Sequence, residues 1–105
     1  MEKYNIFSAL PDDLTCEVFE PIVDQRGIVI ERIISKAHVT PWGQWYCQDR
    51  NEWVMVLQGE AKLVFDDSQI VHLKKGDYIT IPAQCKHRVS WTSEIEPTLW
   101  LAVHY

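Results

Sequence analysis

The sequence predicts an all-β fold, and three observations support that class. The chain has 105 residues, enough for one hydrophobic core and too few for two. Short runs rich in β-branched and aromatic residues recur after residue 15, separated by turn-forming residues. No internal repeat, low-complexity tract or linker interrupts this pattern. We therefore expect one domain over residues 1–105, built as a small sandwich or barrel.

The first part of the chain is predicted as an arm followed by a strand pair. Residues 1–15 form the arm, in which residues 4–10 are a short helix or an irregular entry segment. The runs 16–23 and 28–36 are rich in Val and Ile and are predicted to pair antiparallel. Gly27 lies in the intervening turn, where a positive φ is useful.

Six further strands are predicted downstream, each bounded by turn signals. They cover residues 52–58, 59–65, 70–74, 78–82, 87–92 and 98–105. Gly59 and Gly76 are expected at hairpin reversals, because glycine adopts positive φ without steric cost. Pro82 is expected to end its strand, since proline has no N–H to donate to a sheet.

The run "EWVMVL" at residues 52–57 is apolar on both faces of a predicted strand. By contrast, "AKLVFDD" at residues 61–67 alternates as a half-exposed strand should, with Ala61, Leu63 and Phe65 on one face. The strand at residues 52–57 therefore needs to be covered on both faces. The N-terminal strands or the same surface of a second subunit would supply it, and we predict a homodimer.

Charge and cysteine usage exclude several classes of protein. Ten Lys and Arg against fifteen Asp and Glu give a net charge of −5, so nucleic acid is not an expected partner. The start, "MEKYNIFSALPDDL", has acidic residues where a signal peptide needs an apolar run, and no later window resembles a membrane span. A cytoplasmic protein is expected. Cys16, Cys47 and Cys85 are odd in number and widely spaced, so reduced thiols are predicted.

Two segments resemble the conserved motifs of the cupin family. "EWVMVLQG", from Glu52 to Gly59, is similar to the second half of the first cupin motif, and "GDYITIPAQCKH", from Gly76 to His87, resembles the second motif. The resemblance covers residues 28–105 and implies a double-stranded β-helix, the barrel of small single-domain cupins of the conserved-barrel type. It does not specify an activity, because cupins include dioxygenases, isomerases, epimerases, decarboxylases and sugar binders.

The resemblance also implies a candidate metal site, in which the family uses two histidines and a glutamate from the first motif and a histidine from the second. Glu52 and His87 match that pattern, whereas Tyr46 and Gln48 stand where the two histidines are expected. The remaining ligand set is Gln48, Glu52 and His87. An O, O, N set of this kind fits Mn²⁺ or Fe²⁺ better than a tight zinc site. The expected cofactor is a weakly held divalent ion (Mn, Fe, Ni or Zn), and no metal at all is the alternative.

The same residues are consistent with two hypotheses of function that need no metal. In a metal-free isomerase or epimerase, His87 transfers a proton, Glu52 orients it and Tyr46 acts as the acid. In a sensor or structural barrel, these side chains only bind a ligand or fill the lumen.

A small molecule bound in the lumen is the expected partner. The candidate ligand-binding residues are Tyr46, Gln48, Trp91 and His104. Trp91 is included because it follows His87 by four residues on the same strand face. His104 is included on the condition that it shares an inward face with Trp100.

Overall fold

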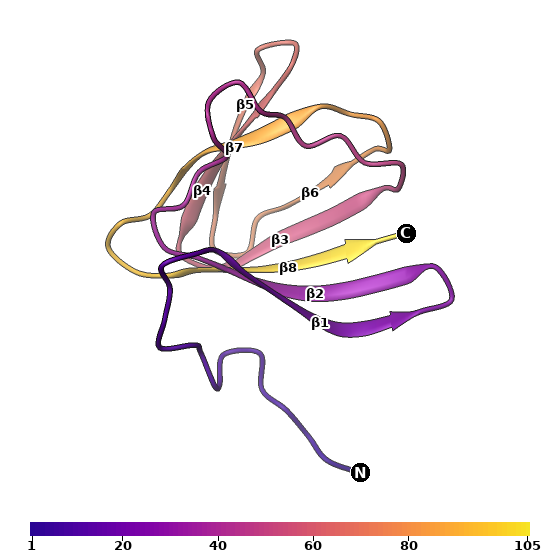
Figure 1. The fold of residues 1–105 in the computed structure, drawn as a ribbon, viewed down its shortest axis with the longest axis vertical. Coiled ribbons are helices and arrows are strands. Elements are labelled where there is room, and N and C mark those ends of the chain that lie inside the picture. Colours follow the sequence, from indigo (N-terminus) through magenta and orange to yellow (C-terminus); the bar gives the residue numbers. More distant parts are fainter.

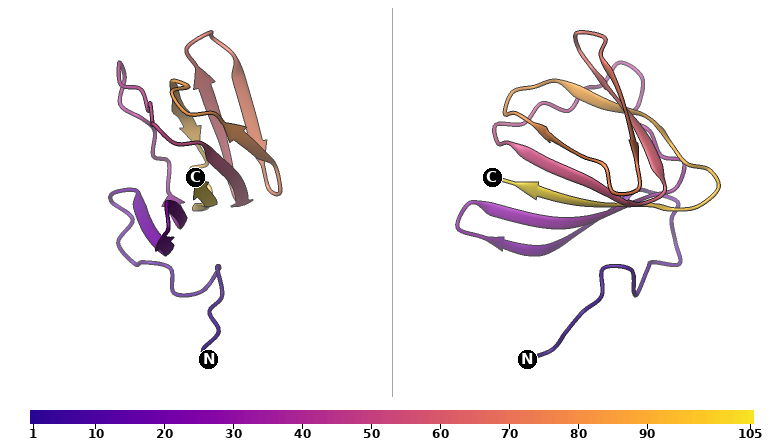
Figure 2. Two further views of the ribbon diagram at one scale, coloured as in Figure 1. Left: turned by 90° about the vertical axis from the view of Figure 1, so that its right-hand side faces the viewer. Right: turned by 180° about the vertical axis from the view of Figure 1, so that it is seen from behind.

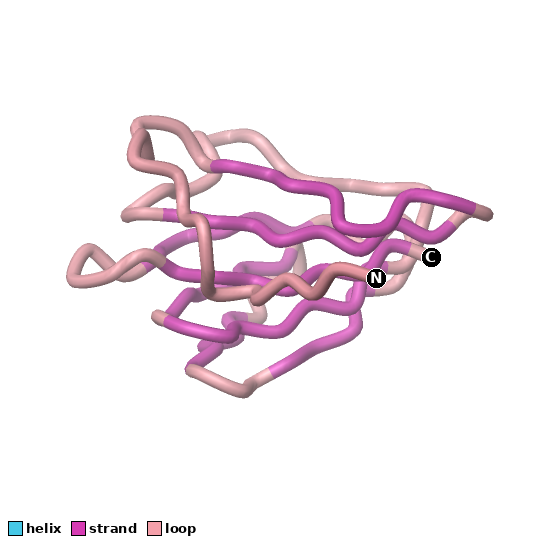
Figure 3. The backbone as a smooth tube through the Cα atoms, turned by 90° about the horizontal axis from the view of Figure 1, so that it is seen from below, coloured by secondary structure: helices cyan, strands magenta, loops and turns pink.

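The computed structural model describes all 105 residues and contains eight strands and no helix. The strands are β1 (Val18–Gln25), β2 (Ile28–Ser35), β3 (Glu52–Gln58), β4 (Glu60–Phe65), β5 (Ile70–Lys74), β6 (Tyr78–Ile81), β7 (His87–Thr92) and β8 (Thr98–His104). Every predicted strand is present, with ends shifted by about two residues at most. The all-β class is confirmed, and Figure 3 shows a backbone made only of strands and loops.

The strands form two antiparallel sheets that enclose one core. The larger sheet has the order β1-β2-β8-β3-β6, and the smaller sheet has the order β5-β4-β7. Figure 1 shows β1, β2, β8 and β3 side by side, with the smaller sheet above them. The last strand, β8, lies between β2 and β3, so its side chains reach the centre of the molecule.

The core lies between the inner faces of the two sheets. On β3, Val54 and Val56 are buried, and on β4 the alternating residues Ala61, Leu63 and Phe65 are buried. The alternation on β4 agrees with the sequence prediction. The cluster is completed by Ile33, Leu73, Ile81, Trp100 and Ala102.

Two of the predicted hairpin turns are instead crossings between the sheets. Gly59 connects β3 in the larger sheet to β4 in the smaller sheet, and Gly76 lies between β5 and β6, which also belong to different sheets. The prediction of hairpins at these glycines is wrong, although both have positive φ values, +83° and +89°. Gly27 (φ +78°) does lie in a hairpin, between β1 and β2.

The N-terminal arm is irregular rather than helical. No helix precedes β1, and the carbonyl groups of Ile6 and Ser8 accept hydrogen bonds from Nη1 of Arg32, at 3.0 and 2.6 Å. Arg32 also forms an ion pair of 2.8 Å with Glu20. Figure 2 shows the arm leaving the body of the molecule beside β1 and β2.

The outer face of the larger sheet is only partly covered. Trp53, Met55 and Leu101 are half-buried on this face, and Tyr78, whose ring contacts Trp53, is 65% exposed. The cover expected on the second face of β3 is therefore incomplete within one chain. The fold contains no helix with the length and apolar character that crossing a bilayer requires.

Candidate functional site

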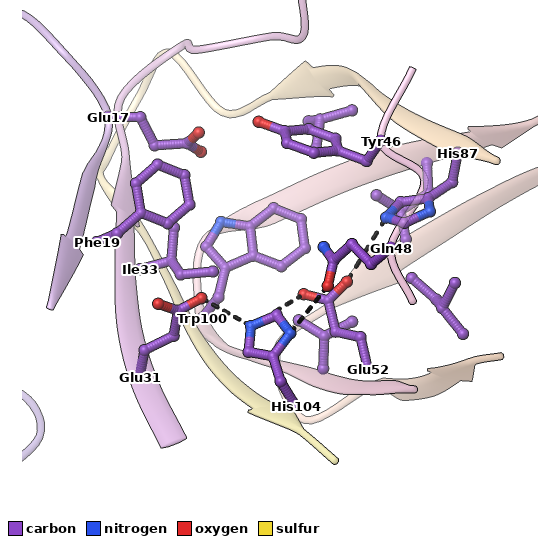
Figure 4. A pocket seen from close by; sticks show the side chains of 14 residues that line it. Glu17, Phe19, Glu31, Ile33, Tyr46, Gln48, Glu52, His87, Trp100 and His104 are labelled. Carbon is purple, nitrogen blue, oxygen red and sulfur yellow. Dashed lines mark hydrogen bonds and ion pairs between the residues drawn. The ribbon is translucent and has the colours of Figure 1, made fainter. Parts of the chain in front are cut away.

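A cavity of about 80 Å³ lies between the two sheets (Figure 4). Its wall combines apolar residues from the core with a group of polar side chains at one end of the strands. The lining residues are Glu17, Phe19, Glu31, Ile33, Tyr46, Gln48, Glu52, Val54, Leu63, Ile81, His87, Val89, Trp100 and His104.

Strand register brings the polar side chains together. Glu52, the first residue of β3, is paired with His104, the last residue of β8, so both point into the cavity from neighbouring strands. Tyr46 forms an isolated antiparallel bridge with His87, the first residue of β7, through backbone bonds of 2.7 and 3.0 Å. This bridge carries the segment before β3 across to the smaller sheet.

His87 faces Glu52 from the opposite sheet. Its Nδ1 donates to the carbonyl oxygen of Cys85 at 2.9 Å, which leaves Nε2 directed at Glu52 Oε1, 3.5 Å away. Burial alone lowers the pKa of His87, but the Glu52 carboxylate and the Cys85 carbonyl outweigh burial and raise the pKa above its ordinary value. An imidazole of this kind can carry a proton near neutral pH.

His104 forms a second polar centre next to the first. Its Nε2 donates to Oε1 of Glu31 at 2.8 Å, its Nδ1 lies 3.1 Å from Oε1 of Gln48, and Glu52 Oε2 is 4.0 Å from Nε2. Sequence reasoning missed Glu31. The available signal was alternation along β2, where Glu31 and Ile33 share the inward face.

Tyr46 closes one side of the cavity. Its ring stacks on that of His87, with centroids 5.8 Å apart and an interplanar angle of 28°. Burial, followed by the negative charges of Glu17 and Glu52, raises the pKa of Tyr46, so its hydroxyl keeps its proton and is a hydrogen-bond donor.

A third carboxylate, Glu17, lies on the same side of the cavity and was also missed from the sequence. It accepts a hydrogen bond from the Ser35 hydroxyl, and Ser35 Oγ in turn accepts one from Trp100 Nε1 at 3.1 Å. This chain of hydrogen bonds fixes the indole of Trp100 in the cavity wall.

The family comparison agrees with this architecture. The cupin domain family matches residues 37–104, from the segment before Tyr46 to His104. The chain belongs to the cupin family. No curated protein matches this cupin.

Solved structures similar to this cupin extend over almost its whole length. A protein from Ralstonia eutropha JMP134, described as a putative mannose-6-phosphate isomerase, has a TM-score of 0.93 and 41% identity, covering 99% of this chain and 97% of that one. An RmlC-like cupin from Desulfovibrio desulfuricans has a TM-score of 0.76 and 18% identity, covering 99% and 96%. A cupin superfamily protein from Desulfitobacterium hafniense has a TM-score of 0.74 and 16% identity, covering 90% and 82%. The last two show the fold alone.

The ligand set that the cupin motifs imply is not assembled as a metal centre here. The side-chain oxygen of Gln48 is directed at His104 Nδ1, so within the expected ligand set only Glu52 and His87 face one another. No group of three or more His, Cys, Asp or Glu side chains is arranged to hold a metal ion. The donor set therefore does not fit a divalent ion without rearrangement, and we derive no chemical step from a metal.

Trp91 lies outside the cavity, which corrects the expectation that it shares a face with His87. A register shift between β4 and β7 inserts an extra residue, so Val89 pairs with Leu63 while Trp91 pairs with Lys62 on the outer face. There the Trp91 ring lies 5.6 Å from Lys62 Nζ.

Proposed function

We propose that this cupin binds a small polar molecule in the cavity between its sheets. The observation that carries the proposal is that the side chains of Glu52 and His87 face one another inside the cavity without close contact. Their side chains are only 12% and 7% exposed, yet the closest approach between them is 3.5 Å, longer than an ordinary hydrogen bond. Both side chains line the cavity, so His87 Nε2 and the Glu52 carboxylate can bond to one ligand at the same time.

A purely structural barrel is less well supported. In that case Tyr46 and Gln48 would fill the lumen, but both line a space of about 80 Å³. Apolar walls with a few convergent polar groups are the usual composition of a ligand site. The cavity combines Val54 and Leu63 with the polar group around Glu52 in this way.

The arrangement also supports proton-transfer chemistry as a second function. His87 has a raised pKa, Glu52 faces its Nε2, and the Tyr46 ring stacks on its ring. One group could remove a proton from a bound molecule while another returns a proton to a neighbouring atom, which is the basis of isomerisation and epimerisation. The name of the Ralstonia relative, putative mannose-6-phosphate isomerase, is in keeping with this class of reaction.

A screen with a blocked control tests binding. The wild type and Val54→Phe would be screened by ligand-observed NMR against small polar metabolites, because Val54 lines the cavity and a phenyl ring would fill it. We expect compounds that bind the wild type and not the variant, with melting curves showing that the variant is folded. Equal binding to both proteins, or no binding to either, would refute the proposal.

Hydrogen exchange tests the proton-transfer function. Compounds that bind would be incubated with the protein in D₂O, and deuterium uptake at carbon would be measured. We expect uptake that falls by about 10²-fold or more in His87→Asn and in Tyr46→Phe, with binding retained. Uptake equal to that of a protein-free control would leave this cupin as a binding protein only.

A further inference from the structure

The cavity carries an excess of negative charge and no basic side chain other than histidine. Three carboxylates line it, from Glu17, Glu31 and Glu52, and neither Lys nor Arg is among the lining residues. Carboxylates of this kind are normally ionised at neutral pH. Counted as ionisable side chains, the three carboxylates of the lining outnumber its two imidazoles, His87 and His104.

Two arginines that neighbour cavity residues on β7 and β2 are held away from the cavity. Arg88 follows His87 on β7 and faces outwards, with its guanidinium 5.3 Å from the Trp42 ring and 5.6 Å from the Trp45 ring. Arg32 alternates with the cavity residue Ile33 on β2, and it bonds to Glu20 and to the N-terminal arm. Neither cation is available to compensate a bound anion.

The three carboxylates differ in how far the protein itself satisfies them. Glu31 accepts a hydrogen bond of 2.8 Å from His104, and Glu17 accepts one from the neutral Ser35 hydroxyl. Glu52 has only the two imidazoles, at 3.5 and 4.0 Å. Figure 4 shows the Trp100 indole in the wall of the cavity that Glu17 and Glu52 also line, so an aromatic ring is available to a bound cation.

On the basis of the proposed binding function, we propose that the ligand of this cavity is a small organic cation. An ammonium group would bind at Glu52, and hydroxyl groups on the same molecule would bond to His87 and Tyr46. Phosphate and carboxylate ligands are disfavoured, because each would enter a negatively charged space without a Lys or Arg partner. The ligand class would therefore differ from the phosphorylated sugar in the name of the Ralstonia relative.

Three probes with one carbon skeleton test the charge preference. The protein would be titrated at neutral pH with 3-amino-1,2-propanediol, glycerol and glycerol 3-phosphate, and the ring resonances of His87 and His104 would be followed by NMR. We expect the amine to bind more tightly than glycerol by about tenfold, and the phosphate to bind more weakly than glycerol. Phosphate binding as tight as that of the amine, or no response to the amine, would overturn the proposal.

Matched variants separate the local charge from the charge of the whole protein. Glu31→Gln and Glu52→Gln each remove one carboxylate from the cavity, whereas Glu94→Gln removes one from an exposed loop. The preference for the amine should shrink in the two cavity variants and stay unchanged in Glu94→Gln. An equal loss in all three would show a general charge effect and refute the proposal.

The metabolite screen distinguishes failure of the ligand class from failure of binding itself. If the screen finds anions that bind the wild type and not Val54→Phe, the binding function stands and the cationic ligand class is overturned. If nothing binds in the screen or in the titrations, both are refuted.

Discussion

At the scale of single residues, Glu52 is the centre of the site. It stands between His87 and His104, and each of its oxygens lies nearer to a different ring. Because it is the first residue of β3, a short displacement of that strand would change both distances. We infer that Glu52 couples the two histidines, so a substitution of Glu52 will alter the surroundings of both rings.

The raised pKa of His87 predicts a pH dependence of stability. The folded state holds the proton of His87 more tightly than the unfolded chain, whose pKa is near 6.5, owing to Glu52 and the Cys85 carbonyl. The stabilisation is complete below the unfolded pKa and is lost as pH rises through the folded pKa. Urea unfolding at several pH values above and below 6.5 would measure the slope.

Glu52→Gln is the matched control for this experiment, because it removes the charge and keeps the shape. We expect a clearly smaller dependence on pH in this variant than in the wild type. The same slope in both proteins would show that Glu52 does not raise the pKa of His87.

Gly59 gives a prediction about packing. Its φ is +83°, and a Cβ placed there would lie 2.8 Å from Thr98 Cα, so Gly59→Ala must move backbone atoms. We expect a loss of about 3 kcal/mol in the free energy of unfolding, measured by urea denaturation. Gly27→Ala, where φ is +78° but the space is open, should cost only about 1 kcal/mol. Equal costs at the two positions would show that contact with Thr98 is unimportant.

At the scale of strands, the second half of the first cupin motif is retained without the histidines that precede it. The segment that carries Tyr46 and Gln48 is irregular apart from the bridge to His87, whereas Glu52 and His87 lie at strand starts. Glu52 and His87 therefore occupy the positions expected from the cupin motifs, whereas a phenol and an amide stand at the two positions before Glu52.

Metal analysis tests this interpretation directly. After growth with Mn, Fe, Ni and Zn, we expect the wild type to hold far less than one metal ion per chain. The double variant Tyr46→His with Gln48→His should gain metal, because imidazoles suit these ions better than a phenol or an amide. Near-stoichiometric metal in the wild type that disappears in His87→Ala would establish a metal centre and contradict our view of the donor set.

Strands were predictable from the sequence, but their partners were not. Alternation and turn residues are local signals, and they placed β3 and β4 correctly. The sheet to which each strand belongs depends on contacts between distant residues, so the local signals at Gly59 do not distinguish a crossing between sheets from a hairpin. The insertion of β8 between β2 and β3 has no local signal at all.

The candidate site was predictable only where a local motif marks its residues. Motif spacing selected Tyr46, Gln48, Glu52 and His87, and all of them line the cavity. Glu17, before β1, and Glu31, on β2, belong to no motif, and a glutamate in an alternating strand is usually exposed to solvent. The single bulge in β7 reversed the face of Trp91, an effect that no periodicity argument detects.

At the scale of the whole molecule, the exposed side of the larger sheet predicts self-association. Met55 and Leu101 are paired across β3 and β8 on the outer face, and both are only half-buried. A second copy related by a two-fold axis would cover this face with the same apolar residues, which is the commonest arrangement of homo-oligomers. We therefore expect the mass of a dimer in light scattering at micromolar concentration.

Charge placed on that face should separate the two chains. Leu101→Lys puts a cation at the centre of the expected interface and should weaken the dimer by about tenfold or more. Ile70→Lys is the matched control, because Ile70 is 65% exposed on β5 in the other sheet. Sedimentation velocity over a range of concentrations would compare both variants with the wild type. A monomeric wild type would refute the dimer, and loss of the dimer in Ile70→Lys alone would place its interface on the smaller sheet.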